Sequence, residues 1–375
     1  MSRKVIPVIA LASTIALILG ACSGGGGGTS GNETTAPGNE ISVPGASAEA
    51  NAYMNTLYKK VKDSGKTTIV MYGPSPSTAS GLWDAFTKRF PGITVNPQDQ
   101  ADGTSLTKLK LEASSGQRVA DVMNSGNNGI APVAAEPNIC VKPEIKTAPA
   151  KDLVFTLEDK VLTFTYRMFG FVYNTDLVKK ADAPTTWHQL LEPKWKDKIE
   201  VYDPTFIGGS RFIFSYMLLP GAPKDLGEDY LKQLATQGLN YTSQEPNVIS
   251  DVASGRFLVG IGAYKGFYDT AKAKGSPIGW VFPIKEGNVM IKSGYCQVQD
   301  SPNFDASSLL INWIFTSEGQ KAIAEKTGAY GALPSAPGPA GAPALKDVVQ
   351  LPQLAGALSQ YDPYFAIVDK YFKKG

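Results

Sequence analysis

Hydrophobic positions recur at helical and strand spacing in alternation from about residue 50 onward. Tyr53, Leu57, Tyr58 and Val61 lie on one face of a helix that ends at Gly65. The β-branched run TTIVMYG that follows is typical of a strand. Further elements are expected in the order helix, strand, helix, strand: 78–90, ITV (93–95), 106–113 and VADVM (119–123). Strands and helices that alternate at this spacing predict a parallel sheet with helices on both faces.

The second half of the chain repeats this alternation. It offers the strand RMFGFVYNT (167–175) and then the helix TTWHQLLEPKW (185–195), with Thr186 and Gln189 as its capping box. The remaining expected elements are the strands KIEVYDP (198–204), FLVGIGAY (257–264), IGWVFP (278–283) and NVMIKSGYCQV (288–298), and helices through 210–219, 227–238, 307–316, 318–328 and 363–374. This pattern favours two α/β lobes over one long sheet.

The first 49 residues differ in character from the rest. MSRK is followed by the apolar stretch VIPVIALASTIALIL and then by Leu19-Gly20-Ala21-Cys22, which resembles the lipobox of bacterial lipoproteins. We therefore expect a signal peptide over 1–21 and a lipid on Cys22; an ordinary signal peptide or a start anchor with a chance cysteine is the alternative. Residues 22–49 are expected to form a flexible Gly/Ser-rich linker with a reach of about 30 Å. The protein would then be extracytoplasmic and lipid-anchored to the cell membrane, at the cell surface or in the periplasm.

Charge and cysteine content narrow the function classes. The 375 residues carry a formal charge of +2, which becomes 2 − 2 = 0 once Arg3 and Lys4 are removed with the signal peptide. A chain without a basic excess lacks the electrostatic footprint of a nucleic-acid-binding protein. Outside the cytoplasm, Cys140 and Cys296 are a candidate disulfide, with two separate buried thiols as the alternative.

Sequence patterns of common enzyme classes are missing. The chain has one histidine, His188, and neither a Gly-x-Ser-x-Gly elbow nor a Walker pattern. The spacing of acidic residues does not indicate a pair of catalytic carboxylates either, although such a pair depends on the fold and not on sequence spacing. The sequence predicts neither an enzyme nor a cofactor.

Several segments resemble the extracellular solute-binding proteins of ABC transporters, in the branch of ferric-iron, thiamine, polyamine and phosphonate binders. They are LYKKVKDSGKTTIVMYGPSP, FVYNTDLV, PTTWHQLLEPKWKDKIEVYDP, SGRFLVGIG and INWIFTSEGQKAIAEKTGAY, in the order that the family uses. The resemblance implies a two-lobed α/β fold of the type II periplasmic-binding-protein kind, with hinge-linked lobes and a ligand cleft. Lobe one would hold residues 50–172 and 288–375, and lobe two residues 173–287. It also implies a monomer that delivers its solute to a membrane permease.

Ligand contacts are expected in loops after strand ends, where open α/β sheets bind their ligands. In YDPTFIGGSR, the amides of Gly208, Gly209 and Ser210 at a helix start could hold an anionic oxygen, with Arg211 as a further partner. A plain glycine turn with Arg211 facing solvent is the alternative. The other candidates are Ser75, Ser77, Thr78, Ser125, Asn127, Tyr173, Asp203, Thr205 and Tyr264. Each of these could instead serve as a helix cap or as strand packing.

A metal ligand set is not expected. The ferric relatives hold iron with adjacent tyrosines in the region that matches GIGAYKGFY, whereas Tyr264 and Tyr268 are four residues apart here. The sequence therefore favours a small organic solute, anionic or zwitterionic, such as a phosphonate or carboxylate. A ferric-iron transport protein is the alternative, followed by a surface hydrolase and an adhesion lipoprotein.

Overall fold

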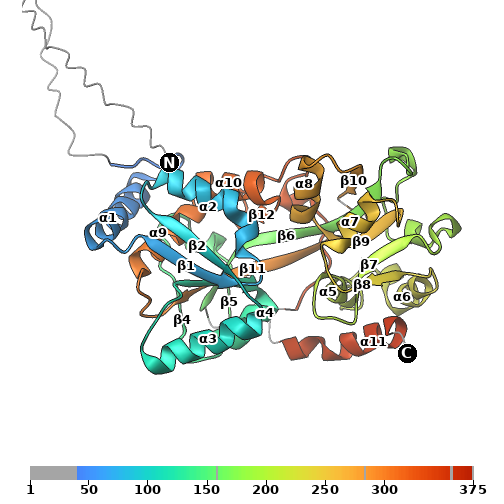
Figure 1. Ribbon diagram of the computed structural model, residues 1–375, viewed down its shortest axis with the longest axis horizontal. Helices are drawn as coiled ribbons and strands as arrows, with labels where there is room; N and C mark the ends of the chain where they lie inside the picture. Colours follow the sequence, from blue (N-terminus) through green and yellow to red (C-terminus); the bar gives the residue numbers. More distant parts are fainter. Residues whose placement is uncertain (1–39, 158, 283, 355–357, 374–375) are drawn as a thin grey trace, which may run out of the picture. The chain divides into compact units, whose positions relative to one another are not determined.

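The computed structural model describes residues 40–157, 159–282, 284–354 and 358–373 (Figure 1). The expected signal peptide, Cys22 and most of the linker lie outside these residues. Within them, no helix is both long and apolar enough to cross a bilayer.

The folded part of the chain begins earlier than expected. Helix α1 (Ala48–Ser64) is capped by the side chain of Ser47 and ends at Gly65, whose φ of 69° is left-handed. The preceding residues already pack on the body of the protein: Val43 is buried, and Ile41 exchanges hydrogen bonds with the side chain of Asn55. The expected linker of residues 22–49 is therefore too long at its C-terminal end.

Two sets of parallel strands form the ends of one curled sheet. In the first set β1 (Thr68–Gly73) lies between β2 (Thr94–Asp99) and β3 (Val122–Gly126); in the second β7 (Ile199–Tyr202) lies between β8 (Asn240–Thr242) and β9 (Val259–Tyr264). The helices of the first set are α2 (Ser80–Arg89), α3 (Asp102–Ser115) and α4 (Asn127–Ala134). Those of the second are α5 (Gly209–Tyr216), α6 (Glu228–Ala235), α7 (Asn247–Ala253) and α8 (Lys265–Ala273). The parallel arrangement expected from the alternation is present in both halves.

Two long antiparallel strands join the halves. Strand β6 (Val161–Asn174) pairs with β11 (Val289–Val298) along its first part and with β9 and β10 (Ile278–Val281) along its last part. The change of partner falls at Phe169, which pairs with both Val289 and Tyr264. The chain thus enters the second half a few residues before the expected boundary at 172. The short strands β4 (Cys140–Val141), β5 (Phe155–Thr156) and β12 (Tyr330–Gly331) pair along β6 and β11.

Hydrophobic side chains gather in separate cores on the two sides of this crossing. The first core contains Trp83 and Phe86 of α2 together with Trp313 of α9 (Phe304–Ile314). Helix α10 (Ser317–Thr327) also packs there. The second core surrounds Trp187 and Phe214. The two cores give the two-lobed α/β fold that the pattern predicts. The expectation of two lobes in place of one long sheet is wrong, however, because both lobes share one continuous 12-stranded sheet.

The C-terminal helix differs from its expected assignment. Helix α11 (Asp362–Phe372) packs against α5 and α6, and Phe365, Val368 and Phe372 belong to the second core (Figure 1). Residues 288–375 were expected in lobe one as a block. The end of the chain instead returns to lobe two, where the apolar side chains of α11 pack in the second core.

Cys140 and Cys296 form a disulfide between β4 and β11. Both cysteines are buried in a third cluster with Met123, Ile139 and Val298. The bridge ties the two-residue strand β4, which has little pairing of its own, to a central strand of the sheet.

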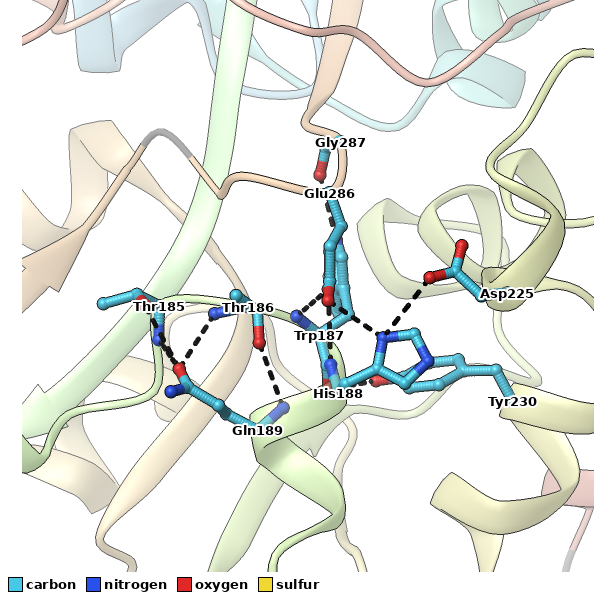
Figure 2. A network of polar contacts seen from close by, with 9 residues as sticks. All are labelled: Thr185, Thr186, Trp187, His188, Gln189, Asp225, Tyr230, Glu286 and Gly287. Atoms are coloured by element: carbon cyan, nitrogen blue, oxygen red, sulfur yellow. Dashed lines mark hydrogen bonds and ion pairs between the residues drawn. The ribbon is translucent and has the colours of Figure 1, made fainter.

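The chain returns from lobe two toward lobe one at residues 286–287. A polar network around His188, the only histidine in the sequence, holds this segment (Figure 2). The Glu286 carboxylate lies 2.9 Å from His188 Nδ1 and accepts hydrogen bonds from the amides of Trp187 and His188. Trp187 Nε1 donates to the carbonyl of Gly287 at 2.9 Å. His188 is therefore occupied in holding residues 286–287 against lobe two.

The expected helix over 185–195 is only partly correct. Thr186 and Gln189 do form the capping box, each side chain accepting from the other's backbone amide. However, the segment folds as two 3₁₀ turns, His188–Leu191 and Pro193–Trp195. Pro193 disfavours a helical residue before it and cannot donate to a continuing helix.

A buried carboxylate in β7 should make stability depend on pH. Glu200 is fully buried beside Asp251, one oxygen has no donor among the described residues, and burial raises its pKa to about 8. The folded state then holds a proton that the unfolded chain releases above about pH 4.5. The contribution of Glu200 to the free energy of unfolding is therefore fully present below about pH 4.5 and is lost as the pH rises toward 8.

We expect Glu200→Gln to remove this loss, which should amount to about 1–2 kcal/mol because Asp251 and Arg256 are partly screened by solvent. Urea unfolding at pH 5, 6.5 and 8 measures it. Glu325→Gln, at an exposed ion pair in α10, is the control. Its free energy of unfolding should change with pH by the same slope as that of the wild type. Equal slopes in wild type and Glu200→Gln would contradict the prediction.

Candidate functional site

Two adjoining cavities lie where the two lobes meet at the crossing strands. The larger has a volume of about 400 Å³ and the smaller about 60 Å³, and both are lined by Pro74, Ser125, Gly126 and Arg167. We call the two together the central cleft. Its walls come from the loops after β1 and β3, from β6 and β11, and from the loop before α5. A volume of several hundred cubic ångströms suits an organic molecule.

Two basic residues of the crossing strands line the cleft. Arg167 of β6 has its guanidinium 4.0 Å from the centre of the Tyr264 ring, and Lys292 of β11 lines the larger cavity. Neither has an ion pair or a hydrogen bond with any side chain in the described part of the chain. Burial lowers the pKa of Lys292. An anion would relieve the loss of solvation at either charge. Lys292 pairs with Tyr166, whereas Arg167 pairs with Ile291, so the two basic side chains leave opposite faces of the sheet.

Two carboxylates face the same cavity. Burial raises the pKa of Asp102, at the start of α3, and a hydrogen bond from Ser125 opposes this. Burial likewise raises the pKa of Glu245, which the nearby Arg167 opposes. Each carboxylate has one buried oxygen without a hydrogen-bond partner among the described residues. Such oxygens are costly unless a donor is supplied, and a ligand can supply it.

Close approaches explain why glycines line this cleft. A Cβ on Gly129 would lie 2.0 Å from Asp102 Oδ2 and 2.6 Å from Ser125 Oγ. A Cβ on Gly209 would lie 2.8 Å from the Phe169 ring and 3.2 Å from Glu245 Oε1. The glycines at the two helix starts therefore leave room for the carboxylates and for an aromatic ring.

The sequence-predicted residues divide into three groups. Ser75, Ser125, Gly208 and Gly209 line the central cleft. Thr78 and Tyr264 line both the smaller cavity and a neighbouring side cavity of about 1000 Å³, which Ser77 also borders. The residues that border none of these cavities are Tyr173, Asp203, Thr205, Ser210 and Arg211. Asn127 begins α4, and its side chain lies outside the described part.

The residues outside the cleft have local structural partners. Asp203 accepts hydrogen bonds from the amide and hydroxyl of Thr205, which closes the turn after β7. Tyr173 is buried in the second core, and Ser210 is fully buried against Gly262.

Arg211 is the clearest departure from expectation. Its guanidinium makes two hydrogen bonds to Asp369 of α11, at 2.7 and 2.9 Å, and two more to the carbonyls of Pro204 and Thr205. It also lies over the Phe365 ring. Arg211 therefore fastens the C-terminal helix to lobe two and faces neither ligand nor solvent.

The start of α5 also differs from the anion site that its glycines suggest. The Glu245 carboxylate lies beside Gly209, so a second negative charge there would be repelled. The cations that could receive an anion are Arg167 and Lys292, which sequence reasoning missed. A signal was available, because each is the only charged residue in a long apolar strand, VLTFTYRMFGFVYN and VMIKSGYCQV.

No group of three or more His, Cys, Asp or Glu side chains that could hold a metal ion occurs among the described residues.

The chain is similar to several known proteins. Residues 81–353 match the family model described as bacterial extracellular solute-binding protein. An uncharacterized protein of Haemophilus influenzae is 25% identical over 59% of this chain and 65% of its own length. A putative 2-aminoethylphosphonate-binding periplasmic protein of Salmonella typhimurium is 26% identical over 65% of this chain and 70% of its own length.

Solved structures share the fold at low identity. The periplasmic binding protein AfuA of Actinobacillus pleuropneumoniae, with fructose-6-phosphate bound, has a TM-score of 0.60 and 21% identity, covering 82% of this chain and 99% of its own. Iron-bound HitA of Pseudomonas aeruginosa has a TM-score of 0.62 and 18% identity, covering 80% and 99%. Two lobes, a cleft at their junction and a family match over most of the chain lead to one assignment: this chain belongs to the bacterial extracellular solute-binding proteins.

Proposed function

We propose that this protein captures a small zwitterionic solute, bearing a phosphonate or carboxylate and an ammonium group, in the central cleft. The observation that carries the proposal is the balance of charge there. Arg167 and Lys292 form no ion pair among the described residues, although the charge of Arg167 acts on Glu245, and Asp102 and Glu245 each keep a buried oxygen without a donor. Two cations and two carboxylates give a net charge of zero, which suits a solute that is itself neutral overall.

Each pole of the solute has a defined set of partners in this proposal. Arg167 binds the anionic group, and Ser125 lines the same two cavities as Arg167. The ammonium group donates to the free oxygens of Glu245 and Asp102. The name of the Salmonella relatives, which contains 2-aminoethylphosphonate, supports this combination of an anion with an amine.

The position of the cations suggests how binding is signalled. Arg167 and Lys292 lie on β6 and β11, the strands that join the lobes, whereas Glu245 belongs to lobe two and Asp102 to lobe one. A solute that bridges them draws the lobes together, and hinge closure is the form that a permease reads. We further propose that the protein acts without catalysis, as a monomer tethered through a lipid on Cys22, and delivers its solute to an ABC permease.

Calorimetric titration of the folded chain with 2-aminoethylphosphonate tests the proposal. We expect saturable one-to-one binding, and recovery of the solute unchanged by ³¹P NMR. Ethylphosphonate, which lacks the amine, is the matched control and should bind at least tenfold more weakly. Turnover of the solute, or no binding of any amino-phosphonate or amino-carboxylate, would overturn the proposal. Tighter binding of ferric citrate than of every such zwitterion would favour the ferric alternative.

A further inference from the structure

The larger cavity of the central cleft has an apolar wall that a zwitterionic head group does not use. This wall is formed by Leu106, Pro132, Ile207, Ile291, Leu354 and Leu358. None of the six borders the smaller cavity, whereas Arg167 and Ser125 border both. The apolar wall therefore belongs to the larger cavity alone, and it begins beside Arg167, whose cross-strand partner is Ile291.

The lip of this wall exposes aliphatic surface. Ile207 is 58% exposed and its neighbour Phe206 is 46% exposed, in the loop before α5. Large hydrophobic side chains next to each other at the mouth of a cavity are typical of a binding surface. The Asp203 turn closes the start of this loop, and Ile207 borders the larger cavity.

We propose that the solute carries an alkyl or aryl group on its zwitterionic head, and that this group lies against the apolar wall. This rests on the proposed function and names its substrate class as amino-phosphonates or amino-carboxylates with an apolar substituent. A cavity of about 400 Å³ has room for such a group beyond a two-carbon amino-phosphonate. The apolar wall would then favour solutes with a longer alkyl substituent, while the charged residues bind the zwitterionic head group.

A series of 1-aminoalkylphosphonates with two, four and six carbons tests this inference, because the head group stays constant. Burial of each added methylene should lower the dissociation constant about three- to fourfold, so the four extra methylenes of the six-carbon compound should tighten binding roughly 80- to 250-fold relative to the two-carbon one. Ile207→Ser should reduce this gain. Leu177→Ser, at a position that is also 58% exposed but borders none of the cavities, should retain it.

The outcomes separate the two proposals. If the two-carbon compound binds and the six-carbon compound binds equally or more weakly, the apolar group is excluded and the proposed function stands. If the six-carbon compound does not bind at all, the inference fails whatever the shorter compounds do. If Ile207→Ser and Leu177→Ser show the same gain per methylene as the wild type, the apolar wall is not where the chain lies.

Discussion

Replacing both Cys140 and Cys296 by alanine is expected to lower the free energy of unfolding by about 3–5 kcal/mol. The bridge joins residues 156 positions apart, and cross-linking such a long loop removes much of the conformational freedom of the unfolded chain. Alanine avoids placing an unpaired hydroxyl in the buried cluster around Met123 and Val298. Urea unfolding of the oxidised wild type and of the double variant measures the difference.

Reduction supplies the control for this prediction. Dithiothreitol should lower the urea midpoint of the wild type toward that of the double variant and should leave the double variant unchanged. Affinity for 2-aminoethylphosphonate should persist in the folded double variant, since neither cysteine borders the central cleft. Equal unfolding free energies for the oxidised wild type and the double variant would show that the bridge does not stabilise the fold.

Local patterns predicted most of the secondary structure because they are set by neighbours in the chain. The end of α1 at Gly65 was predicted and is set by a left-handed glycine, whereas its start, capped by Ser47, lies within the expected linker. The order of strands and helices likewise indicated two parallel sets. The placement of α11 could not be read this way. An apolar stripe predicts that a helix packs against a hydrophobic core, but it does not indicate which of the two cores.

The site was less predictable for a related reason. Glycines at a helix start are compatible with an anion site, a close ring or a nearby carboxylate, and the structure has the second and third at Gly209. Arg211 could be placed in a loop but not paired, because its partner Asp369 is 158 residues away. Arg167 and Lys292 were not predicted, because the rule that ligands bind at strand-end loops points away from residues inside the strands that join the lobes.

Arg167→Met is expected to weaken binding of 2-aminoethylphosphonate by about 30- to 150-fold, which corresponds to about 2–3 kcal/mol. Methionine keeps much of the aliphatic stem but removes the charge and the donors that would meet the anionic group. The effect on unfolding should be small, because the guanidinium has no ion pair to lose among the described residues. Calorimetric titration measures the affinity, and urea unfolding checks that the variant is folded.

Arg211→Met is the matched comparison, since it removes the same group from the position that the sequence suggested. Here a buried guanidinium leaves Asp369 and two carbonyls without their donor, so the free energy of unfolding should fall by about 2–4 kcal/mol. Its affinity for 2-aminoethylphosphonate in the folded state should stay within about threefold of the wild type. The reverse result, with binding lost in Arg211→Met and kept in Arg167→Met, would return the anion to the start of α5. It would also contradict the proposed closure mechanism, because the solute would then bind no charge on β6, one of the strands that join the lobes.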